Sequence, residues 1–244
     1  MKLYSFCTTN FKRLRDRFES TVPGDVDVEI VNIDHLIIEK GALSGGRAIS
    51  KWKPEFMVDK VGQHWGEVVV VADIDIQFFR PFSDDVIQLL EGKDILFQDR
   101  FRTADRTGPV NIGFIAMQCN GSVLAFWQEV SRVVTKHIND PPRKHRIENP
   151  WWDEGVVNKL LKTTYSKAIK WGTLPDRYWL ANRRSGRNCH RIPADIVLHH
   201  AIRTGPDTIK SKMAQMNFVR DNIGRRVRRS ASAPGALTLY EGKG

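Results

Sequence analysis

The chain alternates between short apolar runs and longer segments in which apolar residues recur at helical spacing. Residues 68–71 are four consecutive valines, a pattern typical of a strand that is covered on both faces. Residues 121–137 carry apolar side chains every three or four positions and predict a long helix. Further strands are expected at 3–8, 26–33, 94–98, 111–115 and 194–198, and further helices at 10–19, 51–61, 84–90, 153–161 and 206–216. This order predicts an α/β fold with a mixed, mainly parallel central sheet.

The first elements indicate a nucleotide-binding half. The strand at 3–8 is followed by a basic amphipathic helix with Asn10 as its expected cap, by a Pro-Gly-Asp turn, and by the strand at 26–33. A Rossmann-like half begins with β-α-β in this way and receives the base and ribose at the end of its first strand. Thr8, at that strand end, is therefore the expected contact to a bound nucleotide.

Composition and charge narrow the class of partner. The 244 residues are 41% hydrophobic and 9% aromatic, which is ordinary for a folded protein and argues against wholesale disorder. The net charge of +10 indicates an anionic partner, and nucleotide diphosphates, anionic membranes and nucleic acids all qualify. The clustered arginines are Arg183, Arg184, Arg187 and Arg191 in one group and Arg225, Arg226, Arg228 and Arg229 in the other. The second group lies in residues 216–244, which we expect to form a basic C-terminal tail.

Cysteine content and the start of the chain suggest a cellular location. Cys7, Cys119 and Cys189 are odd in number and lack metal-ligand spacing, so a disulfide framework is not expected and a reducing compartment fits best. The first residues show neither a signal-peptide pattern nor a long apolar span. We therefore expect a cytoplasmic protein that contacts the inner face of an anionic membrane peripherally, through the basic tail.

Two carboxylates follow the valine run at alternate positions. Asp73 and Asp75 would share one face of a strand, because successive side chains point to opposite sides. Two carboxylates so close at the edge of a core repel each other and lose hydration, so they need a compensating cation. Oxygen ligands favour Mg²⁺ or Mn²⁺, typically shared with a substrate diphosphate. The alternative is a solvated strand end at which both residues begin a turn; the apolar approach and the Phe-Phe-Arg-Pro exit favour the metal site.

Four segments in this order resemble the motifs of GT-A glycosyltransferases, over roughly residues 1–215. The closest likeness is to the retaining nucleotide-diphospho-sugar transferases. The segments are Asp73-Ile74-Asp75, Asn111-Ile112-Gly113-Phe114, Trp152-Asp153-Glu154 with Asn158, and Leu198-His199-His200 with Gly205 and Lys210. Ile112 stands where the family has Thr, and Ala201 stands where a His-x-Asn pattern places Asn. The resemblance implies one GT-A domain, with a nucleotide-binding half at 1–90 and an acceptor half at 91–215.

The resemblance also implies a metal and phosphate site. Asp75 would be a direct metal ligand, and Asp73 would bind the metal, through water, or the donor ribose. His199 or His200 would complete the site, and only one should face inward, because adjacent strand residues point apart. His199, six residues before Gly205 as expected in the family, is the preferred ligand. Lys210 would meet the leaving phosphates, with Lys212 as the substitute.

The same resemblance assigns roles around the sugar. Glu154 would lie beneath the ring as nucleophile or stabiliser of positive charge, as the second acid of a retaining glycosidase does. Asp153 would bind sugar or acceptor hydroxyls, and Asn111 would contact the donor sugar. The competing interpretation is that both acids only stabilise a helix N-terminus through its dipole.

These assignments predict a transferase that uses Mn²⁺ or Mg²⁺. It would move a sugar from a UDP- or GDP-sugar to a hydroxyl of a glycan or lipid-linked acceptor, with retention of the anomeric configuration. No nucleic-acid partner is expected.

Two other functions compete with this one. A haloacid-dehalogenase-like phosphatase also has D-x-D after a strand, but its motif has Thr or Val at the position of Gln77. The Gly-Asp-x-x-x-Asp pair of acids that such a phosphatase has downstream does not occur in this sequence. A noncatalytic protein that binds nucleic acid or an anionic membrane through the basic tail and Trp151-Trp152 would leave the aspartate pair unexplained.

Overall fold

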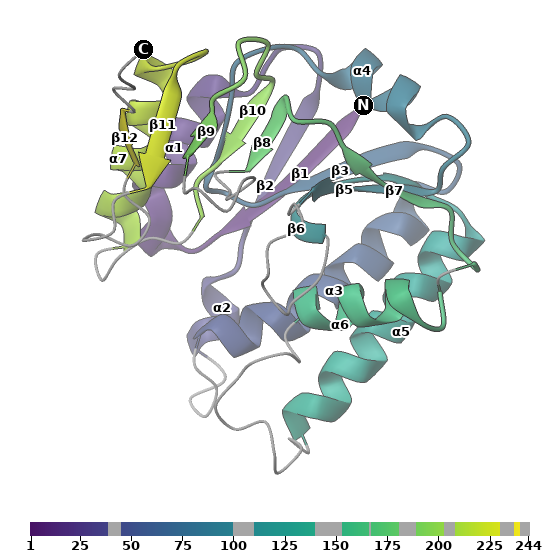
Figure 1. The fold of residues 1–244 in the computed structure, drawn as a ribbon. Helices are drawn as coiled ribbons and strands as arrows, with labels where there is room; N and C mark the ends of the chain where they lie inside the picture. The colour runs from purple at the N-terminus through teal and green to yellow at the C-terminus, as the bar shows by residue number, and fades with distance from the viewer. Residues whose placement is uncertain are drawn as a thin grey trace.

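A six-stranded mixed sheet forms the centre of the molecule (Figure 1). The computed structural model describes residues 1–38, 45–99, 110–139, 153–165, 167–180, 189–202, 208–229 and 237–239. The strands, in spatial order, are β2 (Asp27–Asn32), β1 (Lys2–Cys7), β3 (Val68–Ala72), β6 (Val110–Gln118), β5 (Ile95–Asp99) and β7 (Trp171–Leu174). The predicted mainly parallel, mixed sheet is confirmed: β1 runs parallel to β2 and β3, β5 runs parallel to β7, and β6 is antiparallel to both neighbours.

Strand β6 runs antiparallel to β3, and this direction brings the Asn-Ile-Gly-Phe segment at its start close to the aspartate pair. Because β6 runs against β3, its first residues lie beside the end of β3, with Ala72 opposite Phe114. The amide of Asp73 donates a hydrogen bond of 2.7 Å to the carbonyl oxygen of Gly113. Two segments far apart in the sequence, the aspartate pair and the Asn-Ile-Gly-Phe segment, therefore meet at one edge of the sheet.

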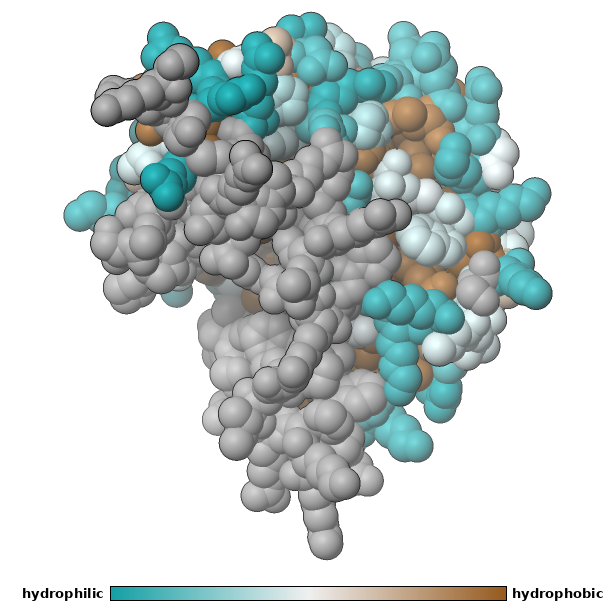
Figure 2. All heavy atoms as spheres, in the orientation of Figure 1, coloured by the Kyte–Doolittle hydropathy of each residue, from teal (hydrophilic) through white to brown (hydrophobic). Residues whose placement is uncertain are grey.

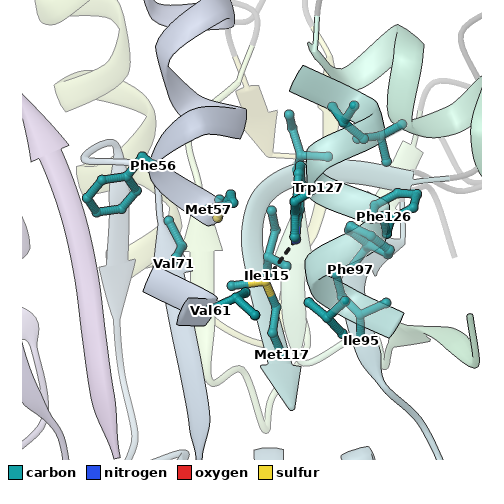
Figure 3. Close-up of a cluster of buried hydrophobic side chains, with 14 of the residues drawn as sticks. Phe56, Met57, Val61, Val71, Ile95, Phe97, Ile115, Met117, Phe126 and Trp127 are labelled. Carbon is teal, nitrogen blue, oxygen red and sulfur yellow. Dashed lines mark hydrogen bonds between the residues drawn. The ribbon is translucent and has the colours of Figure 1, made fainter. Parts of the chain in front are cut away.

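Three helices cover one face of the sheet. They are α3 (Gly45–Gln63), α5 (Gly121–Asn139) and α6 (Asp153–Lys162), drawn below the sheet in Figure 1. Val69 and Val71 belong to the core on this side, where they pack with aromatic and aliphatic residues of α3 and α5 (Figure 3). The indole nitrogen of Trp127 donates to the sulfur of Met117 at 3.0 Å.

The other face carries a second core and a second sheet. Val70 and Ala72 point into this core, so the valine run is covered on both sides, as predicted. The covering elements are α1 (Lys12–Thr21), α4 (Ser83–Leu90), α7 (Thr208–Asp221), and a three-stranded sheet of β4 (Ile76–Phe78), β10 (Leu198–His200) and β8 (Tyr178–Leu180). Asp25 holds the start of α4, because one of its carboxylate oxygens accepts hydrogen bonds from the amides of Phe82 and Ser83, at 2.9 and 2.8 Å.

The described part of residues 216–244 is folded, which corrects the expected basic tail. The strands β9 (Cys189–Arg191), β11 (Arg226–Arg229) and β12 (Leu237–Leu239) form a third, antiparallel sheet. Val219 and Val227 are buried in a small core with Trp179 and Ile192. Apolar residues that alternate with the arginines along the sequence account for this packing. The division of the domain at residues 90 and 215 stays a prediction.

Several element boundaries differ from the predicted ones. A 3₁₀ turn, η1 (Thr9–Phe11), precedes α1, so Asn10 is not a helix cap. The helix α3 begins at Gly45, earlier than expected, and a short helix α2 (Asp34–Ile38) follows β2. The last predicted strand is displaced to Leu198–His200, where pairing with β4 and β8 defines it. Residues 101–109 and Trp151-Trp152 lie outside the described residues.

The surface of the described residues is mainly hydrophilic on the face drawn in Figure 2, with small hydrophobic areas between the polar groups. Among the described residues, no helix combines the length and the apolar character needed to cross a membrane.

Candidate active site

The aspartate pair lies in the tight connection between β3 and β4. Asp73 and Asp75 follow the last residue of β3 and precede Ile76, whose amide donates to the carbonyl oxygen of Asp73 at 3.2 Å. The two residues are thus part of a turn, as the competing interpretation held, and not of the strand itself. Asp75 is nevertheless 7% exposed, so it is not a solvated turn residue. A buried carboxylate requires compensation by charge or hydrogen bonds.

His200, and not the predicted His199, joins the two carboxylates. Its Nε2 atom lies 3.2 Å from Asp75 Oδ1 and 3.8 Å from Asp73 Oδ2. One ligand atom from each of the three residues can be chosen so that all lie within 4.8 Å of one another. His199 faces the other side of β10, with Nδ1 3.3 Å from the Gln77 amide nitrogen. The spacing to Gly205 suggested the wrong histidine, because strand pairing decides which side chain turns inward.

The three residues form a donor set that suits a divalent cation. Two carboxylates favour Mg²⁺ or Mn²⁺, and an imidazole nitrogen is a further acceptable ligand for Mn²⁺. Two lysines offset the negative charge in this structure: Lys53 Nζ lies 2.7 Å from Asp73 Oδ1, and the Lys212 ammonium contacts Asp75 directly. Burial opposes ionisation of Asp75, but the nearby charge of the Lys212 ammonium, the largest opposing cause, helps to hold the pKa of this carboxyl well below its usual range.

The lysines that contact the two carboxylates are Lys53 and Lys212, and not the preferred Lys210. Lys210 is exposed on α7 and does not line the cavity, whereas Lys212, the substitute, reaches Asp75 and also donates to the carbonyl oxygen of Ala201 at 2.8 Å. Lys53 was missed. It is 3% exposed and donates to the carbonyl oxygen of Ile112 at 2.8 Å. One feature of the sequence indicates that Lys53 is buried: it lies four residues before the buried Met57, at the spacing of the buried positions of α3.

A cavity of about 770 Å³ unites most of the predicted residues. It is lined by Thr8, Asp73, Asp75, Asn111, Asp153 and Glu154 among the predicted residues, and by Ser50, Lys53 and Lys212 among the others. Neither His199 nor His200 is among the residues that line it. The hydroxyl oxygen of Thr8 is buried and has no hydrogen-bond partner within the described residues. A second cavity of about 360 Å³ adjoins the first at Cys7 and Thr8.

The first turn of α6 supplies the two acids. Asp153 Oδ1 lies 3.3 Å from the Ser50 hydroxyl and accepts from the amide of Glu154 at 3.0 Å. Removal from water raises the pKa of Asp153 to about 6, with Lys53 opposing the rise and Asp73 adding to it. Glu154 Oε2 accepts a hydrogen bond of 2.6 Å from the side-chain amide of Asn111. The two acids therefore have hydrogen-bond partners on α3 and β6, in addition to their place at the start of α6.

Asn158 ties this helix turn to β6. Its side-chain oxygen accepts from the amide of Val110 at 3.0 Å, and its nitrogen donates to the carbonyl oxygens of Val110 and Glu154 at 2.8 and 2.9 Å. A buried amide that satisfies three backbone groups on two elements holds them in one arrangement. The Asp-Glu-x-x-x-Asn segment is thereby locked to the strand that carries Asn111.

Gly113 leaves room for the His200 ring. A Cβ atom at this position would overlap the Cε1 and Nδ1 atoms of His200, and it would lie 2.9 Å from Asn111 Oδ1. The imidazole therefore packs directly on the backbone of β6. A glycine is therefore required at this position of the Asn-Ile-Gly-Phe segment, because a side chain would overlap the imidazole of the site.

Comparison with solved structures identifies the fold. The chain superposes on the glycosyltransferase GlyE of Streptococcus pneumoniae TIGR4 with a TM-score of 0.52 and 12% identity, covering 85% of this chain and 55% of GlyE. It superposes on a glycosyltransferase involved in the glycosylation of the major capsid of PBCV-1 with a TM-score of 0.57 and 8% identity, covering 89% and 98% of the two chains. The fold is that of these glycosyltransferase structures.

The chain spans about half the length of the GlyE structure. No protein-family model and no curated protein matches the sequence.

Proposed function

We propose that the protein is a GT-A glycosyltransferase that uses Mn²⁺ or Mg²⁺ and a nucleotide-diphosphate sugar. The observation that carries this proposal is the cluster of Asp73, Asp75 and His200, whose two carboxylates line one cavity with Glu154, in a fold shared with glycosyltransferase structures. The cavity of about 770 Å³ is large enough for such a donor. A noncatalytic polyanion-binding protein would have no use for this acid-lined cavity.

The residues around the aspartates fit a donor diphosphate. A divalent ion held by Asp73, Asp75 and His200 would offset the charge that develops on the leaving nucleotide diphosphate. Lys212 would then exchange Asp75 for a phosphate oxygen, since its ammonium needs an anionic partner in either state. Lys53 would remain on Asp73 and keep that carboxylate oriented. Thr8 would contact the ribose or base of a UDP- or GDP-sugar, which fits its unpartnered hydroxyl oxygen.

The residues of α6 fit the sugar end of the cavity. Glu154, oriented by Asn111, would stabilise positive charge on the ring or attack the anomeric carbon, and either role gives retention of configuration. Asn111 and Asp153 would bind sugar or acceptor hydroxyls. A group with a pKa of about 6, such as Asp153, can accept a hydrogen bond from a hydroxyl near neutral pH.

We further propose that a glycan or lipid-linked acceptor is reached at an anionic membrane surface. In β11 the side chains alternate, so Arg226 and Arg228 are exposed while Val227 is buried. Neither arginine forms an ion pair with another described residue. Ile223 and Leu239, near the same sheet, are 37% and 42% exposed. Exposed cations beside exposed apolar side chains suit a membrane interface at the inner face of the cytoplasmic membrane.

The metal-dependent donor site can be tested by binding. Asp75→Ala should abolish Mn²⁺-dependent binding of UDP- and GDP-sugars in calorimetry, and Asp73→Ala should weaken it strongly. Lys210→Ala, on an exposed position of α7, is the control and should bind as the parent does. In the parent, a donor at 100 times its Kd should raise the unfolding free energy by about 2.7 kcal/mol. Metal-supported binding that survives both aspartate changes would overturn the proposed site.

A further inference from the structure

A buried glutamine lies against the imidazole of the proposed metal site. Gln98 is 0% exposed, at the point of β5 where the register to β6 shifts. Its side-chain oxygen lies 2.9 Å from His200 Nδ1, and its side-chain nitrogen lies 3.3 Å from the carbonyl oxygen of Tyr178. A primary amide buried in an apolar core costs free energy unless both ends are paired, and here both are.

The partner at each end defines the orientation of the amide. The carbonyl oxygen of Tyr178 can only accept, so the NH₂ group of Gln98 must face it. The amide oxygen then faces His200, and because this oxygen can only accept, Nδ1 must carry the proton. In the neutral ring Nε2 is consequently the atom with the free lone pair, and Nε2 is the atom nearest to Asp75 and Asp73.

Without this contact the opposite tautomer would be favoured. An imidazole beside two carboxylates gains a hydrogen bond when Nε2 carries the proton and donates it to Asp75. That tautomer presents no lone pair to a cation at the carboxylates. Gln98 competes with it by making Nδ1 the donor, and Gly113 leaves room for the ring against the backbone of β6. Hydrogen bonds of this kind orient metal-bound histidines and select the ligating nitrogen.

We infer that Gln98 is a positioning residue that holds His200 in the Nδ1-protonated tautomer, so that Nε2 serves as the metal ligand. The inference rests on the proposed metal site. It predicts a property of the metal-free protein, the tautomer, as well as one of metal binding.

The test uses three substitutions. Gln98→Met keeps the side-chain length but cannot accept the proton of Nδ1 with comparable strength, and Gln98→Glu keeps an acceptor toward His200. The matched control is Gln77→Met. Gln77 is 1% exposed and contacts His199, the neighbouring histidine on the opposite side of β10, together with the carbonyl oxygen of Met216. Circular dichroism checks that each variant is folded.

The two readouts are nitrogen NMR of the histidine rings in metal-free protein, at a pH where His200 is neutral, and Mn²⁺ affinity by electron paramagnetic resonance. The parent and Gln77→Met should show His200 protonated at Nδ1. Gln98→Met should shift the ring toward Nε2 protonation and weaken Mn²⁺ binding by about 10- to 100-fold, whereas Gln98→Glu should retain the parental tautomer.

A parental His200 protonated at Nε2, or unchanged Mn²⁺ affinity in folded Gln98→Met, would overturn the role of Gln98. If the parent shows the Nδ1 tautomer but binds no Mn²⁺, the proposed metal site fails, while the control of the tautomer by Gln98 stands or falls on the NMR of Gln98→Met. If Gln98→Met does not fold, the parental tautomer and the Mn²⁺ affinity of Gln98→Glu decide the case.

Discussion

At the scale of single residues, the site is built from groups that compensate one another. Asp73 is paired with Lys53, and Asp75 is paired with Lys212, which helps to hold the pKa of Asp75 below its usual range. The carboxylate of Glu154 accepts a hydrogen bond from the side-chain amide of Asn111.

Glu154→Gln should separate a catalytic role from a structural one. The variant can still accept the hydrogen bond from Asn111 through its amide oxygen, but it loses the negative charge. Turnover should fall by about two to four powers of ten if the charge supplies roughly 3–5 kcal/mol of barrier reduction. Donor affinity should change little. Glu55→Gln, on the exposed side of α3, is the control and should leave turnover unchanged.

The stereochemistry of the same reaction gives a second readout. Proton NMR of the first-formed product should show a retained anomeric configuration. Normal turnover of Glu154→Gln would show that Glu154 only stabilises the start of α6, and an inverted product would show that the retaining mechanism is wrong.

At the scale of elements, ion pairs and side-chain hydrogen bonds hold the second sheet and its helices around the site. Asp85 in the first turn of α4 accepts hydrogen bonds from Arg177 Nε at 3.0 Å and from the Tyr178 hydroxyl at 2.7 Å. These bonds join α4 to β8, the strand that pairs with β10 and its histidine. Burial alone would raise the pKa of Asp85, but the hydrogen bonds from Arg177 and Tyr178 outweigh it and lower the pKa below its usual range.

This connection predicts a pH-dependent stability. Because the pKa of Asp85 is lower in the folded state, its contribution is complete above the unfolded pKa of about 3.9 and is lost as pH falls through the folded value. Asp85→Asn should cost about 1–2 kcal/mol of unfolding free energy at pH 7, allowing for partial exposure. Urea unfolding of parent and variant at pH 7 and pH 3 measures the difference, which should be smaller at pH 3. An equal difference at both pH values would mean that the ionised carboxylate is not responsible.

At the scale of the whole molecule, the C-terminal segment both completes the fold and presents positive charge. Deleting it would remove Val219 and Val227 from a core, so truncation cannot test a membrane role without disturbing the fold. Charge reversal of exposed arginines is the better experiment, because it leaves the buried side of β11 unchanged.

Arg226→Glu combined with Arg228→Glu should lower binding to vesicles that contain anionic lipid. Each cation near such a surface contributes about 1 kcal/mol, and reversal replaces attraction by repulsion, so cosedimentation should fall by at least tenfold at low salt. The parental binding should weaken with added salt. Lys12→Glu with Arg15→Glu on the exposed side of α1 is the control. Equal binding by both double variants and the parent would remove the membrane proposal.

The sequence by itself determined five of the six strands of the central sheet, the burial of the valine run on both of its faces, and the residues of three motifs that line the cavity; the edge strand β7 was not predicted. These features follow from local patterns, because alternation and helical spacing record which side chains are buried. The tertiary structure decided the inward histidine, the two lysines at the carboxylates and the folding of the arginine-rich C-terminal segment. His200 meets Asp75 only because β10 pairs with β4, and Lys212 reaches Asp75 across 137 positions of the chain. Such contacts depend on packing between distant elements, which a local pattern does not encode.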